Sequence, residues 1–68
     1  MNELIFLVED SQEGGYNARA LGESIFTQGT TLDDLSRNIR EAVLCHFEEA
    51  NVPKIIRIHY VRNEILEV

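Results

Sequence analysis

The sequence is short of several residue types that small proteins use to stabilise themselves. Its 68 residues include one cysteine, one proline and no tryptophan. Because Cys45 is alone, no disulfide can form within the chain, and no Cys/His cluster has the spacing of a structural zinc site. A domain of this size buries only about 60% of the surface that its unfolded chain exposes. We therefore expect self-association, as a homodimer or a larger assembly, to supply further stability.

Positive charge is also scarce, since 6 Lys and Arg residues face 12 Asp and Glu, for a formal net charge of -6. This balance repels phosphate backbones and favours a basic protein over nucleic acid as a partner. The longest apolar run, at 4–8, is far shorter than the roughly 18 residues of a membrane span, and no basic signal-peptide start precedes it. The sequence predicts a cytoplasmic protein that does not bind membranes.

The spacing of apolar and turn-forming residues predicts a single domain over residues 1–68. Strands are expected where apolar side chains cluster or alternate over a short run, at 3–9, 16–21, 24–28 and 54–62. The Gly14-Gly15 pair predicts a hairpin, which makes the first two strands antiparallel. A helix is expected over 32–50, capped by Thr30 or Thr31 and ended by Pro53. The fold class is α+β: a two-layer β-β-β-α-β arrangement with one helix packed on one face of an antiparallel-dominated sheet.

One helix covers only one face of such a sheet. The last strand carries apolar residues on both faces, which is typical of a central strand or of a strand covered by a second subunit. We expect self-association through alternate residues of this strand, namely Ile55, Arg57, His59 and Val61. Apolar Ile5 and Leu7 also remain on the uncovered face, and the segment 64–68 either adds a short strand or docks on a partner.

Aromatic side chains are expected mostly in the core. Phe6, Phe26, Phe47 and Tyr60 fit core positions, whereas Tyr16 follows the glycine turn and belongs to a residue type that is enriched at interfaces.

No arrangement of residues in the sequence predicts catalysis, a metal site or a cofactor. The carboxylates of Glu9, Asp10 and Glu13 share one loop but lack the pattern of a calcium-binding loop. Adjacent residues on a helix point about 100° apart, so Cys45 and His46 cannot act together as nucleophile and base. We expect Cys45 on the polar side of the helix and His46 on its apolar side, and a dyad of Cys45 with His59 stays open.

Three short motifs follow one another along the chain. They are Glu13-Gly14-Gly15-Tyr16, then Thr27-Gln28-Gly29 followed by Thr31-Leu32-Asp33-Asp34, then Asn38 with Glu41-Ala42. Their order and spacing resemble the HicB-like antitoxin family. This resemblance implies a partial RNase H-like fold that binds and masks a small basic toxin of the HicA type, an mRNA-cleaving enzyme. The DNA-binding domain that full antitoxins of this family carry has no counterpart before Val68, so direct DNA binding is not expected.

The residues expected to bind the partner are Glu13, Tyr16, Thr27 and Gln28, all from the motif-bearing edge. Two other functions stay open. One is a stand-alone homodimeric regulatory or small-ligand-binding protein whose ligand the sequence does not name. The other is a nuclease, since RNase H-like folds can hold Mg²⁺, although the first strand offers carboxylates only at its end, in Glu9 and Asp10.

Overall fold

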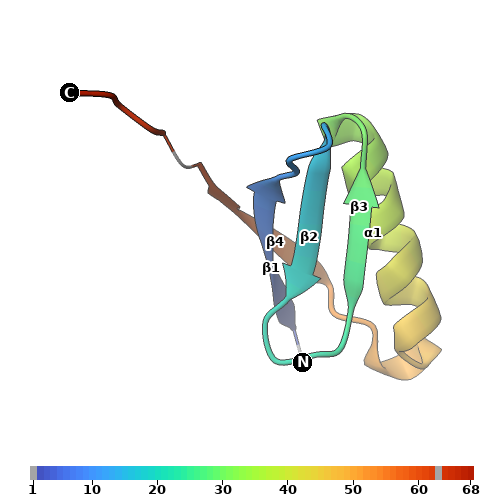
Figure 1. Ribbon diagram of the computed structural model, residues 1–68. Helices are drawn as coiled ribbons and strands as arrows, with labels where there is room; N and C mark the ends of the chain where they lie inside the picture. The colour runs from blue at the N-terminus through green and yellow to red at the C-terminus, as the bar shows by residue number, and fades with distance from the viewer. Residues whose placement is uncertain (1, 63) are drawn as a thin grey trace.

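The computed structural model describes residues 2–62 and 64–68 and contains a four-stranded mixed sheet with one helix packed on it (Figure 1). The elements follow in the order β1 (Glu3–Asp10), β2 (Tyr16–Ala20), β3 (Phe26–Gly29), α1 (Leu32–His46), the 3₁₀ turn η1 (Glu49–Asn51) and β4 (Ile55–Val61). This order confirms the predicted α+β class and its β-β-β-α-β arrangement.

The strands lie side by side in the order β3-β2-β1-β4. β1 pairs antiparallel with β2, and β2 with β3, whereas β4 runs parallel to β1. The helix returns the chain across the sheet, so β4 arrives beside β1 in the same direction, as parallel pairing requires. β4 is therefore an edge strand, which excludes the first of the two expected alternatives, a central strand.

The hairpin between β1 and β2 is built as the glycine pair predicts. Gly14 and Gly15 have φ angles of 96° and 80°, in the left-handed region that favours glycine. The amide of Ser11 donates to the carbonyl of Gly15 at 3.0 Å, and the amide of Gly14 donates to the carbonyl of Ser11 at 3.1 Å. These bonds close the turn and set the register of β1 against β2.

The helix begins as predicted but ends earlier. Thr31 is the N-cap, and its side-chain oxygen accepts the amide of Asp34 at 3.1 Å. The helix stops at His46 because Phe47 adopts an extended backbone, with φ of -101° and ψ of 147°, and packs half-buried against the core. Ala50, expected as the last apolar helical position, instead lies exposed in η1.

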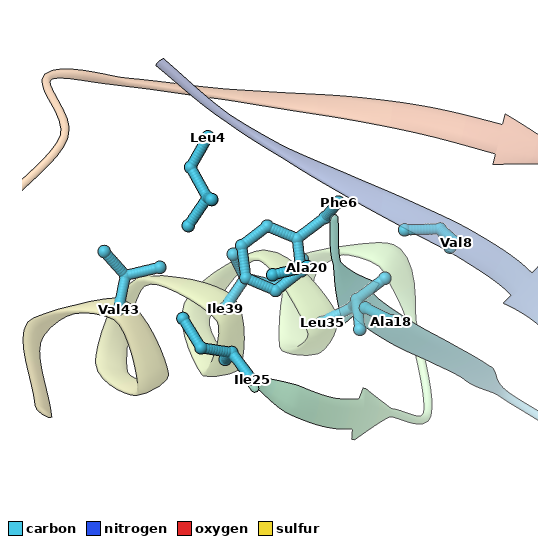
Figure 2. Packing of buried hydrophobic residues seen from close by; sticks show 9 residues of the cluster. All are labelled: Leu4, Phe6, Val8, Ala18, Ala20, Ile25, Leu35, Ile39 and Val43. Carbon is cyan, nitrogen blue, oxygen red and sulfur yellow. The ribbon is translucent and has the colours of Figure 1, made fainter. Parts of the chain in front are cut away.

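The core lies between the helix and the covered face of the sheet (Figure 2). Phe6 and Val8 are fully buried at its centre, and the small side chains of Ala18 and Ala20 let the helix approach β2. The nine buried hydrophobic residues are Leu4, Phe6, Val8, Ala18, Ala20, Ile25, Leu35, Ile39 and Val43.

Phe26 does not belong to this core, contrary to expectation. It lies opposite Arg19 in the β2–β3 register, on the face away from the helix, and its side chain is 67% exposed. Ile25, one residue earlier, takes the buried position instead. Among the described residues, no helix has the length and apolar character needed to cross a membrane.

Candidate functional site

A polar groove of about 380 Å³ lies where the β1–β2 hairpin, the end of β3 and the start of α1 meet. We call it the hairpin groove. Figure 1 shows these three segments together at one end of the molecule. The lining residues are Ser11, Glu13, Gly14, Tyr16, Asn17, Gln28, Gly29, Thr30, Asp34 and Asn38. All three sequence motifs contribute to this one surface.

The structure brings three of the four expected partner-binding residues together. Glu13, Tyr16 and Gln28 line the hairpin groove. Thr27 does not line it, and lies opposite Ala18 in the β2–β3 register. It is half-buried there.

Two glycines allow the walls of the hairpin groove to approach each other. A Cβ atom on Gly15 would lie 2.5 Å from the carbonyl oxygen of Gly29, closer than side chains tolerate. A Cβ atom on Gly29 would lie 2.5 Å from the backbone nitrogen of Leu35. The absence of a side chain at Gly15 therefore lets the hairpin approach β3, and its absence at Gly29 lets β3 approach α1.

Asn38 fastens the helix to β3 at the floor of the groove. Its side-chain amide donates to the carbonyl of Gln28 at 2.7 Å. Nearby, the hydroxyl of Thr30 donates to the carboxylate of Asp34 at 2.5 Å. Neither Asn38 nor Asp34 was among the predicted site residues, although their spacing of four positions places both on one face of the helix.

This end of the molecule is acidic. Glu9 and Asp10 are the last two residues of β1, Glu13 lies in the hairpin, and Asp33 and Asp34 lie in the first turn of α1. No Lys or Arg belongs to the described residues that line the hairpin groove. Arg37 lies 3.5 Å from Asp34, but this pair is exposed and offsets the local negative charge only weakly.

A pair of tyrosines connects the hairpin groove to β4. The ring of Tyr16 meets that of Tyr60 edge to face, with centroids 5.8 Å apart. The hydroxyl of Tyr60 donates to the carboxylate of Asp10 at 2.5 Å. This hydrogen bond is the main reason that the pKa of Tyr60 is raised from 10.0 to about 12.

The four expected self-association residues share the face of β4 that no helix covers. The register places Ile55, Arg57, His59 and Val61 opposite Glu3, Ile5, Leu7 and Glu9 of β1. All four residues of β4 are exposed, and Ile5 and Leu7 are half-buried. The guanidinium of Arg57 bonds the carboxylate of Glu3, which raises the pKa of Arg57.

Cys45 is exposed, as predicted. His46 is also exposed rather than packed on the apolar side, because the helix ends at this residue. Its Nε2 atom lies 3.5 Å from the carboxylate of Glu23, and its ring meets that of Phe47 edge to face. Within the described part of the chain, no three His, Cys, Asp or Glu side chains gather closely enough to hold a metal ion.

These features define a small α+β protein with a polar groove at one end of its sheet. The chain belongs to the UPF0150 family. It is 54% identical to a UPF0150 protein of Archaeoglobus fulgidus over 52 residues, which cover 76% of this chain and 77% of that protein. It is 38% identical to a UPF0150 protein of Thermotoga maritima over 66 residues, covering 97% and 93%. No family model and no solved structure matches the chain.

Proposed function

We propose that the protein is a non-catalytic binding module that resembles HicB antitoxins and masks a small basic mRNA-cleaving toxin of the HicA type. The hairpin groove carries this proposal, because it gathers Glu13, Tyr16 and Gln28 from two of the motifs into one surface. The third motif supplies Asn38, which fixes the groove floor.

The charge of the hairpin end supports a basic partner. Five carboxylates lie there, from Glu9, Asp10, Glu13, Asp33 and Asp34. Complementary potentials speed the encounter of two proteins and disfavour partners of like charge. Tyr16 adds an aromatic side chain of the kind that anchors protein interfaces. Nucleic acid is a polyanion and would be repelled from the same end.

The test is co-expression of the tagged protein with a small basic HicA-type protein. We expect the two proteins to copurify and the toxin-induced growth arrest to be relieved. Glu13→Lys should weaken both effects, because it places a positive charge in the groove. Glu41→Lys makes the same change of charge on an exposed helical position outside the groove and should leave both effects intact.

Two results would contradict the proposal. One is the absence of both copurification and rescue. The other is an equal loss of binding in Glu13→Lys and Glu41→Lys, which would mean that net charge rather than the hairpin groove attracts the partner. Circular dichroism of both variants shows whether the fold is retained.

A further inference from the structure

The outer edge of β4 and the segment after it are unusually exposed. Figure 1 shows β4 continuing into a tail that extends away from the rest of the molecule. We define the tail as Glu64–Val68, in which Ile65 and Leu66 are 92% and 83% exposed. A long apolar strand edge is a template for pairing with another chain. Three of the five tail residues are apolar, and their exposure to water costs free energy that burial would recover.

A groove of about 410 Å³ lies between α1 and β4, on the helix side of the sheet. We call it the α1–β4 groove. Its walls are largely apolar, with Val43 from α1 and Ile56 and Ile58 from β4. Arg40 and Lys54 also line it and give it positive charge in an otherwise acidic protein. Its shape and charge therefore suit an extended apolar segment that carries carboxylates.

The tail has this chemistry. Its sequence combines two acidic with three apolar residues, with Glu64 and Glu67 on either side of Ile65 and Leu66. At about 3.3 Å per residue, the seven residues from 62 to 68 reach about 20 Å. The helical wall of the groove, from Ser36 to Leu44, is about 12 Å long at 1.5 Å per residue. One tail is thus long enough to fill one groove.

The tail is poorly placed to enter the groove of its own chain. The groove is lined by residues that precede β4 or lie in its first half, whereas the tail leaves from the other end of the strand. The tail itself, residues 64–68, contains no glycine, proline, asparagine, aspartate or serine with which to reverse direction. The extended tail also gives the molecule a length of 52 Å against widths of 19 and 18 Å.

In a dimer, the tail of one copy can reach the α1–β4 groove of the other. In a two-fold antiparallel pairing of the β4 edges centred on Ile58, Val61 lies opposite Ile55 of the second copy. Arg62 then lies opposite the second copy's Lys54, and the tail continues toward the groove that Lys54 borders. Strand alternation places Leu66 on the same face as Ile58, toward the helix layer.

We infer that two copies of the chain pair along β4 and exchange tails, each tail lying in the α1–β4 groove of the other copy. Leu66 and Val68 fill the apolar part of the groove, Glu64 lies on the same face of the tail, and the negatively charged tail as a whole lies beside Arg40 and Lys54. This interface uses the β4 edge of the sheet, opposite the β3 edge, and does not depend on toxin binding.

The experiment is a charge-reversal exchange followed by sedimentation velocity at low ionic strength. The groove-reversed variant carries Arg40→Glu and Lys54→Glu, and the tail-reversed variant carries Glu64→Lys and Glu67→Lys. Each variant alone places like charges at both contacts, so we expect its dimer dissociation constant to rise at least about tenfold. An equimolar mixture should recover dimers, because each tail then meets a groove of opposite charge.

A second pair of variants tests the apolar contact. Leu66→Asp should also raise the dissociation constant at least about tenfold, as expected for a buried interface anchor. Leu32→Asp makes the same change at a leucine that is 52% exposed and outside the groove, and should leave dimerisation unchanged.

Three results would overturn the inference. They are a wild-type protein that sediments as a monomer throughout the micromolar range, a mixture of reversed variants that stays monomeric, and a Leu66→Asp variant that dimerises as tightly as wild type. A mixture that fails to recover would indicate that each tail folds back onto its own chain. Far-ultraviolet circular dichroism of every variant checks that the monomer fold is unchanged.

Discussion

Alanine substitutions at three glycines test how the hairpin, β3 and α1 come together at the hairpin groove. The three positions separate two physical effects. Gly14 has a φ of +96° but no atom within 4 Å of a built Cβ. Gly29 lacks a positive φ, but its Cβ would lie 2.5 Å from the nitrogen and 2.7 Å from the Cα of Leu35. Gly15 combines a φ of +80° with a 2.5 Å approach to the carbonyl oxygen of Gly29.

The expected costs follow from these geometries. Gly14→Ala meets only backbone strain and should lower the free energy of unfolding by about 1–2 kcal/mol. Gly29→Ala meets only a clash with backbone atoms and should lower it by about 1–3 kcal/mol. Gly15→Ala meets both, so the sum is about 2–5 kcal/mol. A domain of this size has a stability of about 3–5 kcal/mol, so Gly15→Ala should be close to unfolding.

Urea unfolding followed by circular dichroism measures all three costs, at one fixed protein concentration because any self-association adds stability. All three variants should be less stable than wild type. Among them, Gly15→Ala should be less stable than Gly14→Ala. If Gly15→Ala costs no more than Gly14→Ala, the contact between Gly15 and the carbonyl of Gly29 does not constrain the hairpin. That result would refute the role assigned to the motif glycines.

Three further substitutions test other contacts. Asp10→Asn should lower the pKa of Tyr60 from about 12 toward 10.0, measured by phenolate absorbance; an unchanged titration would contradict the hydrogen bond. Since folding raises this pKa, the contact stabilises the fold below about pH 10 and is lost as pH rises through about 12. Asn38→Ala should cost about 1 kcal/mol in urea unfolding through the lost bond to Gln28, and no loss would mean that water replaces it. Leu35→Ala, at a side chain 1% exposed, should cost about 2–5 kcal/mol, and a melting temperature equal to that of wild type would contradict its place in the core.

The features that the sequence predicted correctly depend on local chemistry. The glycine pair sets the hairpin because positive φ angles are needed within the turn itself. Thr31 caps the helix through a bond to an amide three residues away. Alternation and helical spacing then indicate the remaining elements and their order. Each of these signals lies within one short stretch of chain.

The features that the sequence did not predict depend on contacts between distant segments. Phe26 is exposed because the register of β3 against β2 turns Ile25 inward, and a shift of one residue would exchange the two. The helix ends at His46 because the following chain must turn back to bring β4 beside β1. The spacing of apolar residues continues in helical register to Ala50 and does not indicate that the helix ends at His46.

The candidate site shows the same division. Glu13 and Tyr16 flank one turn, so their proximity could be predicted from the motif alone. Thr27 and Gln28 are neighbours on β3, yet only Gln28 lines the hairpin groove, because the half-buried Thr27 lies opposite Ala18 of the core. Asn38 reaches the carbonyl of Gln28 across ten residues, and only the packing of α1 on β3 makes that bond possible.

The order of the strands bears on whether the two proposed partners can bind together. Gln28 of the hairpin groove lies on β3, at one edge of the sheet, and β4 forms the other edge. A dimer paired along β4 therefore leaves both hairpin grooves accessible, one on each copy. The contact between Tyr16 and Tyr60 is the direct physical connection between the two surfaces. If pairing along β4 shifts Tyr60, Tyr16 shifts with it, and toxin affinity should then differ between wild type and the Leu66→Asp variant, compared at a concentration where only wild type dimerises. Equal affinities would mean that the two surfaces act independently.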